Sequence, residues 1–286
     1  AKLSALTGLF EVTPGVYQVR GFDIANMTLI RGETGWIVVD PLTTYETGKA
    51  AFTFAMEHLE RAPISALLYS HSHVDHFGGV FGALDAHGDS KDIPVVAPVG
   101  FLKEATSENM LAGQAMARRA ELMYGRALER SPWGHVTMGL GPGTAFGTMG
   151  VLPPTLTIPS EGGAVDLDGV PFEFMDISGS EAPSEFAFYL PEKGVLHGGE
   201  LVSRTLHNLY TLRGAKVRDA LLWSRLIDKA MERYGAVEIY MGGHLWPMWG
   251  RERIQAWMGG QRDAYKYIHD QTLRYANGGA SPKEIA

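Results

Sequence analysis

The most constraining feature of this sequence is the stretch SHSHVDHFGG at residues 70–79, where His71, His73, Asp75 and His76 fall within six consecutive positions. It follows the apolar run at 64–69, which we expect to form a buried strand. His71 and His73 are two residues apart, so they point to the same side of the strand end, and Asp75 and His76 come round at the start of a following helix. One loop can therefore direct ligand atoms to two neighbouring points, an arrangement suited to a pair of metal ions.

The spacing favours a metal site over a surface loop that happens to contain histidines. A lone histidine is usually not a ligand, but HxHxDH requires four coincidences at fixed offsets after a buried strand. The sequence contains no cysteine, which excludes disulfides, thiolate ligands and a cysteine nucleophile. Any metal must therefore bind nitrogen and oxygen atoms, a donor set that Zn²⁺ accepts.

Composition bounds the class of protein. The chain has 286 residues, 45% hydrophobic and 20% charged, which is typical of a globular protein, and we expect residues 1–286 to form a single domain. A net charge of −7 without any basic run is unlike a nucleic-acid-binding protein. No apolar stretch approaches the roughly 20 residues of a membrane helix, so we expect no integral membrane segment. The start, AKLSALTG, carries no basic and apolar leader, which leaves localisation open.

Two blocks of short strands predict an α/β fold with two packed sheets and outer helices. The expected strands of the first block are 16–19, 27–31 and 36–40, followed by a helix at 43–61. The expected strands of the second block are 164–167, 170–177, 185–190 and 194–197, followed by a helix at 216–234, a strand at 237–241 and a helix at 250–275. Residues 99–130 show a helical pattern. The Gly- and Pro-rich residues 131–154 predict a long loop, a candidate wall or lid for a pocket.

The HxHxDH stretch resembles the signature of the metallo-β-lactamase fold superfamily, which implies an αββα sandwich. That family usually has three further ligands: a histidine in a turn, an aspartate after a strand, and a late histidine. Here the corresponding segments read SGSEAPSE, with Glu181, VLHGGE, with Glu200, and YMGGH, with His244. Glutamate at two of the three positions departs from the common pattern.

These glutamates, with TLHNLYTLRGAKVRDAL at 205–221 and HLWPMWG at 244–250, look like the alkylsulfatase branch, zinc enzymes related to the dodecyl sulfate hydrolases. The resemblance covers almost the whole chain and implies two Zn²⁺ ions per chain. It implies that His71, His73 and Glu181 bind one ion, that Asp75, His76 and His244 bind the other, and that Glu200 bridges them. His197 is expected to be packed or to support the ligands rather than to bind metal.

The resemblance also places a sulfate-binding arginine at Arg213, which we assign to catalysis together with Asp75. Guanidinium suits the three oxygens of a sulfate ester because it presents a fork of donors. An ion pair with a carboxylate such as Asp219 is the alternative role for Arg213. Further candidate substrate-binding residues in the same segment are Asn208, Tyr210 and His207. Six apolar residues are plausible contributors to a wall for the alkyl chain, with core packing as the alternative: Met138, Phe146, Met149, Leu152, Trp246 and Trp249.

The implied activity is hydrolysis of alkyl sulfate esters by metal-activated water, releasing sulfate and an alcohol. The alternatives are a hydrolase of the same fold acting on lactones, thioesters or β-lactams, and a truncated metal-binding domain without turnover. By the resemblance, residues 250–286 begin a helical dimerisation region, which implies a possible homodimer, and the C-terminal sterol-carrier-like domain of the family is absent from this sequence. The capping box at 281–284 predicts a helix start and a polypeptide that continues. The resemblance slightly favours a periplasmic or secreted protein.

Overall fold

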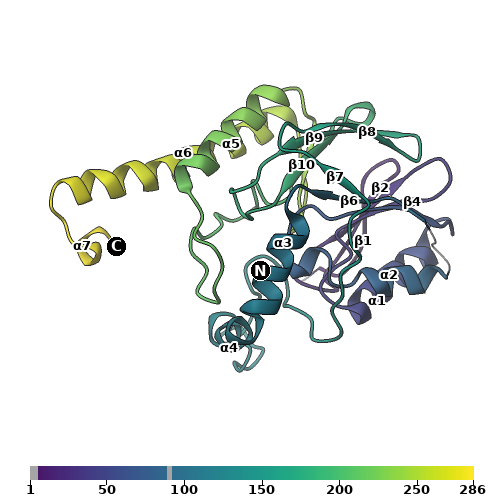
Figure 1. Cartoon of the computed structure of the whole chain (residues 1–286), viewed down its shortest axis with the longest axis horizontal. Coiled ribbons are helices and arrows are strands. Elements are labelled where there is room, and N and C mark those ends of the chain that lie inside the picture. Colours follow the sequence, from purple (N-terminus) through teal and green to yellow (C-terminus); the bar gives the residue numbers. More distant parts are fainter. Residues whose placement is uncertain (1–5, 89–91) are drawn as a thin grey trace.

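Two β-sheets pack face to face, with helices on both outer faces, in this computed structural model, which describes residues 6–88 and 92–286 (Figure 1). The first sheet has the strand order β1-β2-β3-β4-β5-β6-β7. Its strands are antiparallel from β1 to β4 and parallel from β4 to β7. Their bounds are β1 Gly8–Thr13, β2 Val16–Arg20, β3 Met27–Arg31, β4 Trp36–Val39, β5 Ile64–Leu68, β6 Val95–Pro98 and β7 Leu156–Ile158.

The second sheet has the order β13-β12-β11-β10-β9-β8, and only its β11–β12 pair is parallel among the described residues. Its strands are β8 Gly163–Leu167, β9 Val170–Asp176, β10 Phe186–Leu190, β11 Val195–His197, β12 Ile239–Met241 and β13 Met248–Trp249. The α-helices are α1 Tyr45–His58, α2 Val80–His87, α3 Phe101–Thr106, α4 Gly113–Met123, α5 Ala220–Arg233, α6 Arg251–Asn277 and α7 Pro282–Ile285.

Three apolar layers hold the sandwich together, and alternation along the strands assigns side chains to them. Along β10, Phe186 and Phe188 point into the layer between the sheets, whereas Ala187 points to the layer under α5 and α6. In the first sheet, Val38 faces α1 and α2, and its neighbour Val39 faces the second sheet. The predicted αββα sandwich is therefore confirmed, because each sheet buries both of its faces.

Several predicted elements differ from the observed ones. The pattern at 99–130 is not one helix: α3 passes into a π-helical turn, Ser107–Leu111, and α4 ends at Met123, with Gly125 in the left-handed region at φ 61°. The strands β1, β6, β7 and β13 were not predicted. Residues 131–154 form a loop without regular structure, as expected, and the capping box at Ser281 and Glu284 starts α7.

The alternative role for Arg213, an ion pair with a carboxylate, is observed, but the partner is not Asp219. The predicted helix at 216–234 begins at Ala220, because the Asp219 carboxylate caps it by accepting hydrogen bonds from the amides of Leu221 at 2.9 Å and Leu222 at 3.0 Å. The observed partner of Arg213 is Glu108, at 2.6 Å. Within residues 6–88 and 92–286, no helix is both long and apolar enough to cross a membrane.

Candidate metal centre

The residues proposed as metal ligands converge from four loops at one edge of the sandwich. His71 and His73 follow β5, and Asp75 and His76 lie in the 3-10 turn Val74–His76. Residues Glu181, Glu200 and His244 follow β9, β11 and β12, respectively. Strand ends therefore carry the cluster, as is usual for open sheets in α/β proteins.

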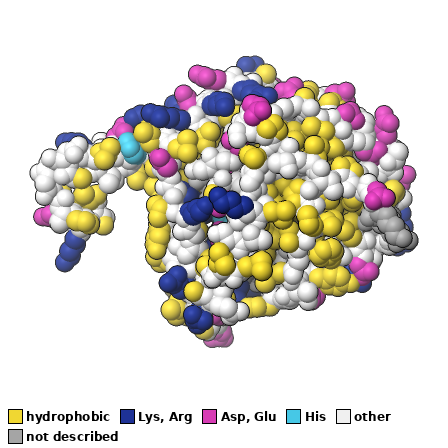
Figure 2. Space-filling view, in the orientation of Figure 1, with side chains coloured by type: hydrophobic (Ala, Val, Ile, Leu, Met, Phe, Trp, Pro, Cys, Tyr) yellow, Lys and Arg dark blue, Asp and Glu magenta, His cyan; other side chains and the backbone are white. Residues whose placement is uncertain are grey.

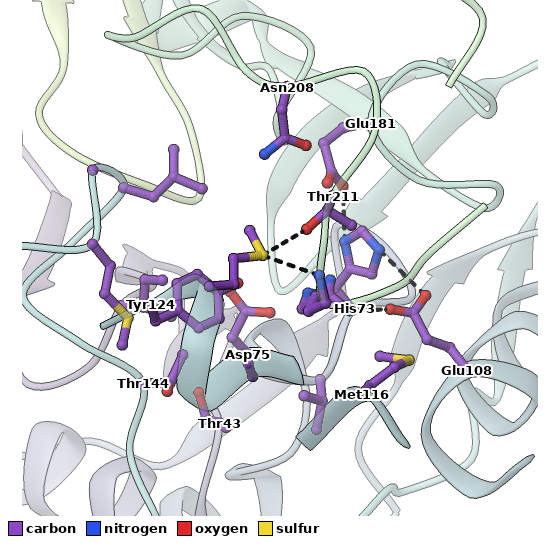
Figure 3. Close-up of a pocket in the computed structure, with 18 of the residues that line it drawn as sticks. Thr43, His73, Asp75, Glu108, Met116, Tyr124, Thr144, Glu181, Asn208 and Thr211 are labelled. Atoms are coloured by element: carbon purple, nitrogen blue, oxygen red, sulfur yellow. Dashed lines mark hydrogen bonds and ion pairs between the residues drawn. The ribbon is translucent and has the colours of Figure 1, made fainter. Parts of the chain in front are cut away.

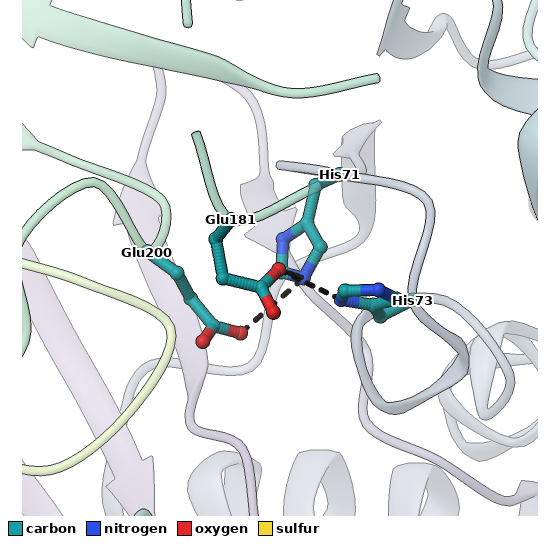
Figure 4. A group of neighbouring side chains, drawn as sticks. All are labelled: His71, His73, Glu181 and Glu200. Atoms are coloured by element: carbon teal, nitrogen blue, oxygen red, sulfur yellow. Dashed lines mark ion pairs between the residues drawn. The ribbon is translucent and has the colours of Figure 1, made fainter. Parts of the chain in front are cut away.

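His71, His73, Glu181 and Glu200 form the first group, with candidate ligand atoms all within 4.8 Å of one another (Figure 4). The His73 Nδ1 atom lies 2.8 Å from Glu181 Oε2. The His71 Nε2 atom lies 3.3 Å from Glu200 Oε1 and 3.6 Å from Glu181 Oε2. All four residues are buried. The structure thus brings together the histidines and the glutamate that the resemblance assigned to one ion.

Asp75, His76, Glu200 and His244 form the second group, again within 4.8 Å. Glu200 Oε1 lies 3.1 Å from His76 Nε2 and 2.8 Å from His244 Nε2. The Asp75 carboxylate lies 3.3 Å and 3.4 Å from the same two nitrogens. Glu200 belongs to both groups, which is the position expected of a bridging ligand.

Several polar atoms in this cluster are arranged to bind cations rather than to form hydrogen bonds with one another. The Nδ1–H of His76 donates to Asp40 at 2.8 Å, and that of His244 donates to the Ile24 carbonyl at 2.9 Å. For neutral imidazoles, both Nε2 atoms then carry lone pairs, and these atoms are only 3.2 Å apart. In the described part of the chain, His71 Nε2 and Glu181 Oε2 are buried without a hydrogen-bond partner. Nitrogen and carboxylate donors directed at two points fit a pair of zinc-type divalent cations.

The electrostatics of the cluster favour positive charge. Burial alone would lower the pKa of His73, but the carboxylates of Glu181 and Glu108 raise that pKa to about 10. Burial and the nearby charge of Glu181 raise the pKa of Glu185 to about 8, as expected where several carboxylates share a site. Divalent cations would offset this concentration of negative charge.

Two buried acids that sequence reasoning missed hold the candidate ligands in place. Asp40, at the end of β4, contacts His76 and accepts a hydrogen bond from the Ser70 amide at 2.7 Å. Glu185 accepts from the amide of Glu200 at 2.7 Å, and it also accepts from the amide of Ala182 at 3.1 Å. Asp40 ends the apolar run WIVVD, so a buried acid directly after a strand was the available signal.

His197 has the packed role that we expected. Its ring stacks on Phe188, with centroids 4.8 Å apart, and its Nδ1 accepts a hydrogen bond from the Gly199 amide at 3.2 Å. Burial lowers the pKa of His197 to about 4, which keeps the ring neutral. Among the described residues, it belongs to neither candidate ligand group.

A cavity of about 860 Å³ opens over the two groups, a volume typical of small-molecule sites (Figure 3). Asp75 and three of the predicted substrate-binding residues, His207, Asn208 and Arg213, line it. Tyr210 does not: its side chain is 56% exposed and lies outside the lining. His207 Nε2 lies 3.5 Å from Glu181 and 3.6 Å from Glu200, so it sits directly against the metal cluster.

The apolar part of the lining comes mainly from α4 and the loop 131–154. Three of the six proposed wall residues, Met138, Phe146 and Met149, line the cavity. The other three are elsewhere: Leu152 packs against the core under α1 and α2, Trp246 lies beside Arg204, and Trp249 donates a hydrogen bond to the Val12 carbonyl. Hydrophobic side chains cover broad areas of the face seen in Figure 2, with basic side chains gathered near its centre.

Two charged residues of the site carried no motif that would have identified them. Glu108 lies in the π-helical turn and contacts both His73, at 3.5 Å, and Arg213, at 2.6 Å. Arg218 pairs with the carboxylate of Glu181. The signal available for Arg218 was its place in the segment 205–221, which already held four candidates.

Comparison with known proteins agrees with this geometry. A family described as the metallo-beta-lactamase superfamily matches residues 20–244. The chain is similar to a linear primary-alkylsulfatase of a Pseudomonas species, at 44% identity over all of this chain and 43% of the relative. It is also similar to an alkyl/aryl-sulfatase of Saccharomyces cerevisiae, at 43% identity over all of this chain and 45% of the relative. It therefore spans less than half the length of these relatives.

Among solved structures, a stereoselective inverting sec-alkylsulfatase from a Pseudomonas species superposes with a TM-score of 0.93 at 40% identity. The match covers 99% of this chain and 45% of that one. A metallo-beta-lactamase from Pontibacter korlensis has a TM-score of 0.58 at 16% identity, covering 90% of this chain and 99% of that one, which is a likeness of fold alone.

Proposed function

Because the chain belongs to the metallo-β-lactamase superfamily, we propose that its cluster holds two zinc ions and that it hydrolyses alkyl sulfate esters to sulfate and an alcohol. The observation that carries the proposal is the conjunction of three parts in one cavity. These parts are a dinuclear ligand set, a guanidinium and an amide able to bind an anion, and an apolar wall. The names of the relatives support the same substrate class.

The ligand assignment follows the two groups. His71, His73 and Glu181 would hold one ion, Asp75, His76 and His244 the other, and Glu200 both. Bound zinc would supply Lewis acidity, which brings the pKa of water near neutrality and makes a nucleophile available at neutral pH. Side chains of the protein would bind the sulfate group and the alkyl chain of the ester.

Arg213 and Asn208 would bind the sulfate group. The guanidinium keeps its charge, because the carboxylate of Glu108 more than offsets the effect of burial and raises the pKa of Arg213 above its ordinary value. A sulfate monoester bears one negative charge on three oxygens, which guanidinium and amide N–H donors match. His207, between this segment and the cluster, can add a further donor.

The methionines and Phe146 of the cavity wall would receive the alkyl chain. Burial of each methylene contributes about 0.8 kcal/mol, so an apolar wall of this extent favours esters with long chains over short ones. The same cavity therefore offers donors for the sulfate group and an apolar wall for the alkyl chain.

Attack at carbon is favoured over attack at sulfur. One relative is named as an inverting sec-alkylsulfatase, and inversion at a stereocentre requires that a bond to carbon is formed and another is broken. In that route sulfate leaves with the ester oxygen, and as a weak base it needs no proton. Hydrolysis in H₂¹⁸O tests this step: label in the alcohol supports cleavage of the C–O bond, and label in the sulfate contradicts it.

Three other hydrolytic functions and one inactive state compete with this proposal. A lactonase, thioesterase or β-lactamase would cleave a different bond, so a panel of the corresponding substrates separates these activities from sulfate release. A metal-binding domain without turnover would load zinc yet leave every ester intact.

The deciding experiment measures zinc content by mass spectrometry and sulfate release from dodecyl sulfate, for the wild-type chain and for Glu181→Ala. About two zinc ions per chain in the wild type, with sulfate release lost in Glu181→Ala, supports the proposal. Fewer than one ion, or full activity without Glu181, contradicts it.

We also propose that two copies associate through α6. The distal part of this helix extends away from the sandwich (Figure 1) and carries exposed Tyr267, Leu273 and Tyr275. A second copy packed against this projecting segment would bury these side chains. Light scattering after size exclusion should give the mass of a dimer for the wild type and of a monomer for Leu273→Glu; a monomeric wild type rejects this interface.

A further inference from the structure

The loop 203–219 carries the anion-binding candidates but has no helix or strand of its own in the described structure. Its position over the metal cluster therefore depends on side-chain contacts. Arg213 provides one of them: its Nη1 donates to Glu108 Oε1 at 2.6 Å and to the Gly214 carbonyl at 3.1 Å. Both hydrogen bonds use Nη1, so within the described part of the chain Nη2 and Nε remain available for an anion.

Glu108 contacts the metal cluster with its other oxygen. Glu108 Oε2 lies 3.5 Å from His73 Nε2, while His73 Nδ1 faces Glu181 at 2.8 Å (Figure 3). The two imidazole nitrogens thus point in opposite directions, one into the cluster and one toward Glu108. A carboxylate in this place orients a ligating histidine and fixes its tautomer.

The Glu108 side chain is shielded from solvent and can therefore hold both His73 and Arg213 in position. It is only 14% exposed, and that of Arg213 is 17% exposed, so solvent screens their ion pair weakly. Glu108 lies in the π-helical turn Ser107–Leu111, a type of irregularity that is frequent at functional sites. One carboxylate therefore joins a candidate zinc ligand to a candidate sulfate-binding arginine.

We propose that Glu108 is a positioning residue that sets the Arg213 guanidinium at a fixed place relative to the metal cluster, so that a sulfate ester binds with its reacting carbon over the metals. The inference rests on the proposed function and deepens it. Glu108 itself does not bind the ester, since a carboxylate repels sulfate.

Because of that repulsion, a purely electrostatic role and a positioning role predict opposite changes in anion affinity. Glu108→Gln removes a negative charge beside an anion site, so Coulomb's law alone predicts tighter binding of an anion. A positioning role predicts the opposite, because Arg213 loses the partner that holds it.

The chain offers a matched control one turn earlier. Glu104, in α3, forms an ion pair with Lys216 of the same loop. The pair connects the same two segments as Glu108 and Arg213, but in the described residues Glu104 forms no ion pair with a candidate ligand. The Glu104 side chain is 11% exposed, much like that of Glu108, whereas its partner Lys216 is 62% exposed. Glu104→Gln therefore removes a carboxylate of similar burial from the same connection, but one whose ion pair is screened by solvent.

The experiment compares zinc-loaded wild type, Glu108→Gln, Glu108→Asp and Glu104→Gln. Three quantities are measured: zinc per chain, calorimetric affinity for decane-1-sulfonate, which cannot be hydrolysed, and kcat and KM for dodecyl sulfate. For Glu108→Gln we expect unchanged zinc content, sulfonate affinity weakened about tenfold and a raised KM. Glu108→Asp should recover part of the affinity because it keeps the charge, and Glu104→Gln should match the wild type.

The other outcomes overturn the inference. Unchanged or tighter sulfonate binding by Glu108→Gln rejects positioning, and loss of zinc assigns Glu108 to metal retention instead. If Glu104→Gln weakens sulfonate binding equally, any ion pair between these two segments holds the loop in place, and Glu108 has no specific positioning role. If the zinc-loaded wild type releases sulfate while Glu108→Gln binds normally, only this inference fails. If the wild type neither releases sulfate nor binds the sulfonate, the proposed function fails, and the inference fails with it.

Discussion

The guanidinium of Arg218 contacts both the backbone and the side chain of Glu181. Its Nε donates to the Glu181 carbonyl at 2.7 Å, and Nη2 pairs with the carboxylate. A third nitrogen, Nη1, donates to Asn208 Oδ1 at 3.0 Å. One buried arginine therefore connects a candidate zinc ligand with a candidate sulfate-binding amide, parallel to the connection that Glu108 makes between His73 and Arg213.

Arg218→Lys should weaken zinc binding although it keeps the charge. Lysine is a point charge and cannot reach the carbonyl, the carboxylate and the amide together. We expect zinc affinity to fall about tenfold, the usual effect of losing a partner of a metal ligand. Competition with a chromogenic chelator measures this. Arg262→Lys, which alters exposed pairs with Asp228 and Asp263, is the control, and an equal effect in both variants would contradict the role given to Arg218.

The ligand cluster could be predicted from the sequence because most of the candidate ligands lie close together in the chain. His71, His73, Asp75 and His76 have fixed offsets at the end of one strand, and those offsets determine which side chains face together. The resemblance supplied Glu181, Glu200 and His244, which lie in separate loops. Without it, short-range patterns would have left these three residues unassigned.

The supporting contacts could not be predicted because they join distant positions. Arg213 and Glu108 are 105 positions apart, and Arg218 and Glu181 are 37 apart. Glu108 also lies where the helical pattern passes into a π-helical turn, which shifts the direction of the following side chains. The strand β6 was missed for a related reason: its four residues are all buried, so they show no alternation.

Tyr240→Phe should destabilise the loop that carries Glu200. The Tyr240 hydroxyl donates to the Val202 carbonyl at 2.8 Å and accepts from the Val202 amide at 3.0 Å, and both residues are buried. Loss of the hydroxyl leaves two buried backbone groups without partners, so the free energy of unfolding should fall by about 2 kcal/mol. Urea denaturation measures the change. Tyr267→Phe, at a side chain that is 66% exposed, should be neutral, and a neutral Tyr240→Phe would show that water replaces the hydroxyl.

Asp168→Asn should weaken the connection between the two sheets. The Asp168 carboxylate, in the turn between β8 and β9, accepts from the Thr34 hydroxyl at 2.8 Å and from the Gly35 amide at 2.9 Å, next to β4. Asparagine tolerates the left-handed backbone at this position, φ 51°, so the substitution removes charge rather than shape. At pH 7 we expect a loss of about 1 kcal/mol in the free energy of unfolding. Asp166→Asn, in β8, is the control, because its carboxylate accepts from the Gly169 amide of the same hairpin, at 3.0 Å, rather than from the other sheet.

The same variant carries a pH prediction with a definite sign. Burial would raise the pKa of Asp168, but the nearby Ser65 side chain and the hydrogen bonds from Thr34 and Gly35 hold that pKa below its ordinary value of 3.8. A lowered pKa in the folded state stabilises the protein above the pKa of the unfolded state, and this contribution disappears as pH falls through the folded-state pKa. The difference between wild type and Asp168→Asn should therefore be constant from pH 7 to roughly pH 5 and shrink below pH 4. A difference that grows on acidification would contradict it.

Phe146→Ala should alter the dependence of the reaction on alkyl chain length. Phe146 lines the cavity, and the Arg126 guanidinium lies 4.0 Å above its ring, which holds the aromatic face in place although the side chain is 75% exposed. Loss of the ring removes apolar contact from the distal part of a long chain, worth about 1 kcal/mol, or a roughly fivefold lower kcat/KM for dodecyl sulfate. A short ester such as butyl sulfate does not extend along the wall and should be cleaved equally by both proteins. Trp133→Ala, in the same loop but 97% exposed and outside the lining, should leave kcat/KM unchanged for both esters. An equal decrease for dodecyl and butyl sulfate in Phe146→Ala would mean that the ring stabilises the loop rather than binding the chain, since only contact with the distal methylenes depends on substrate length.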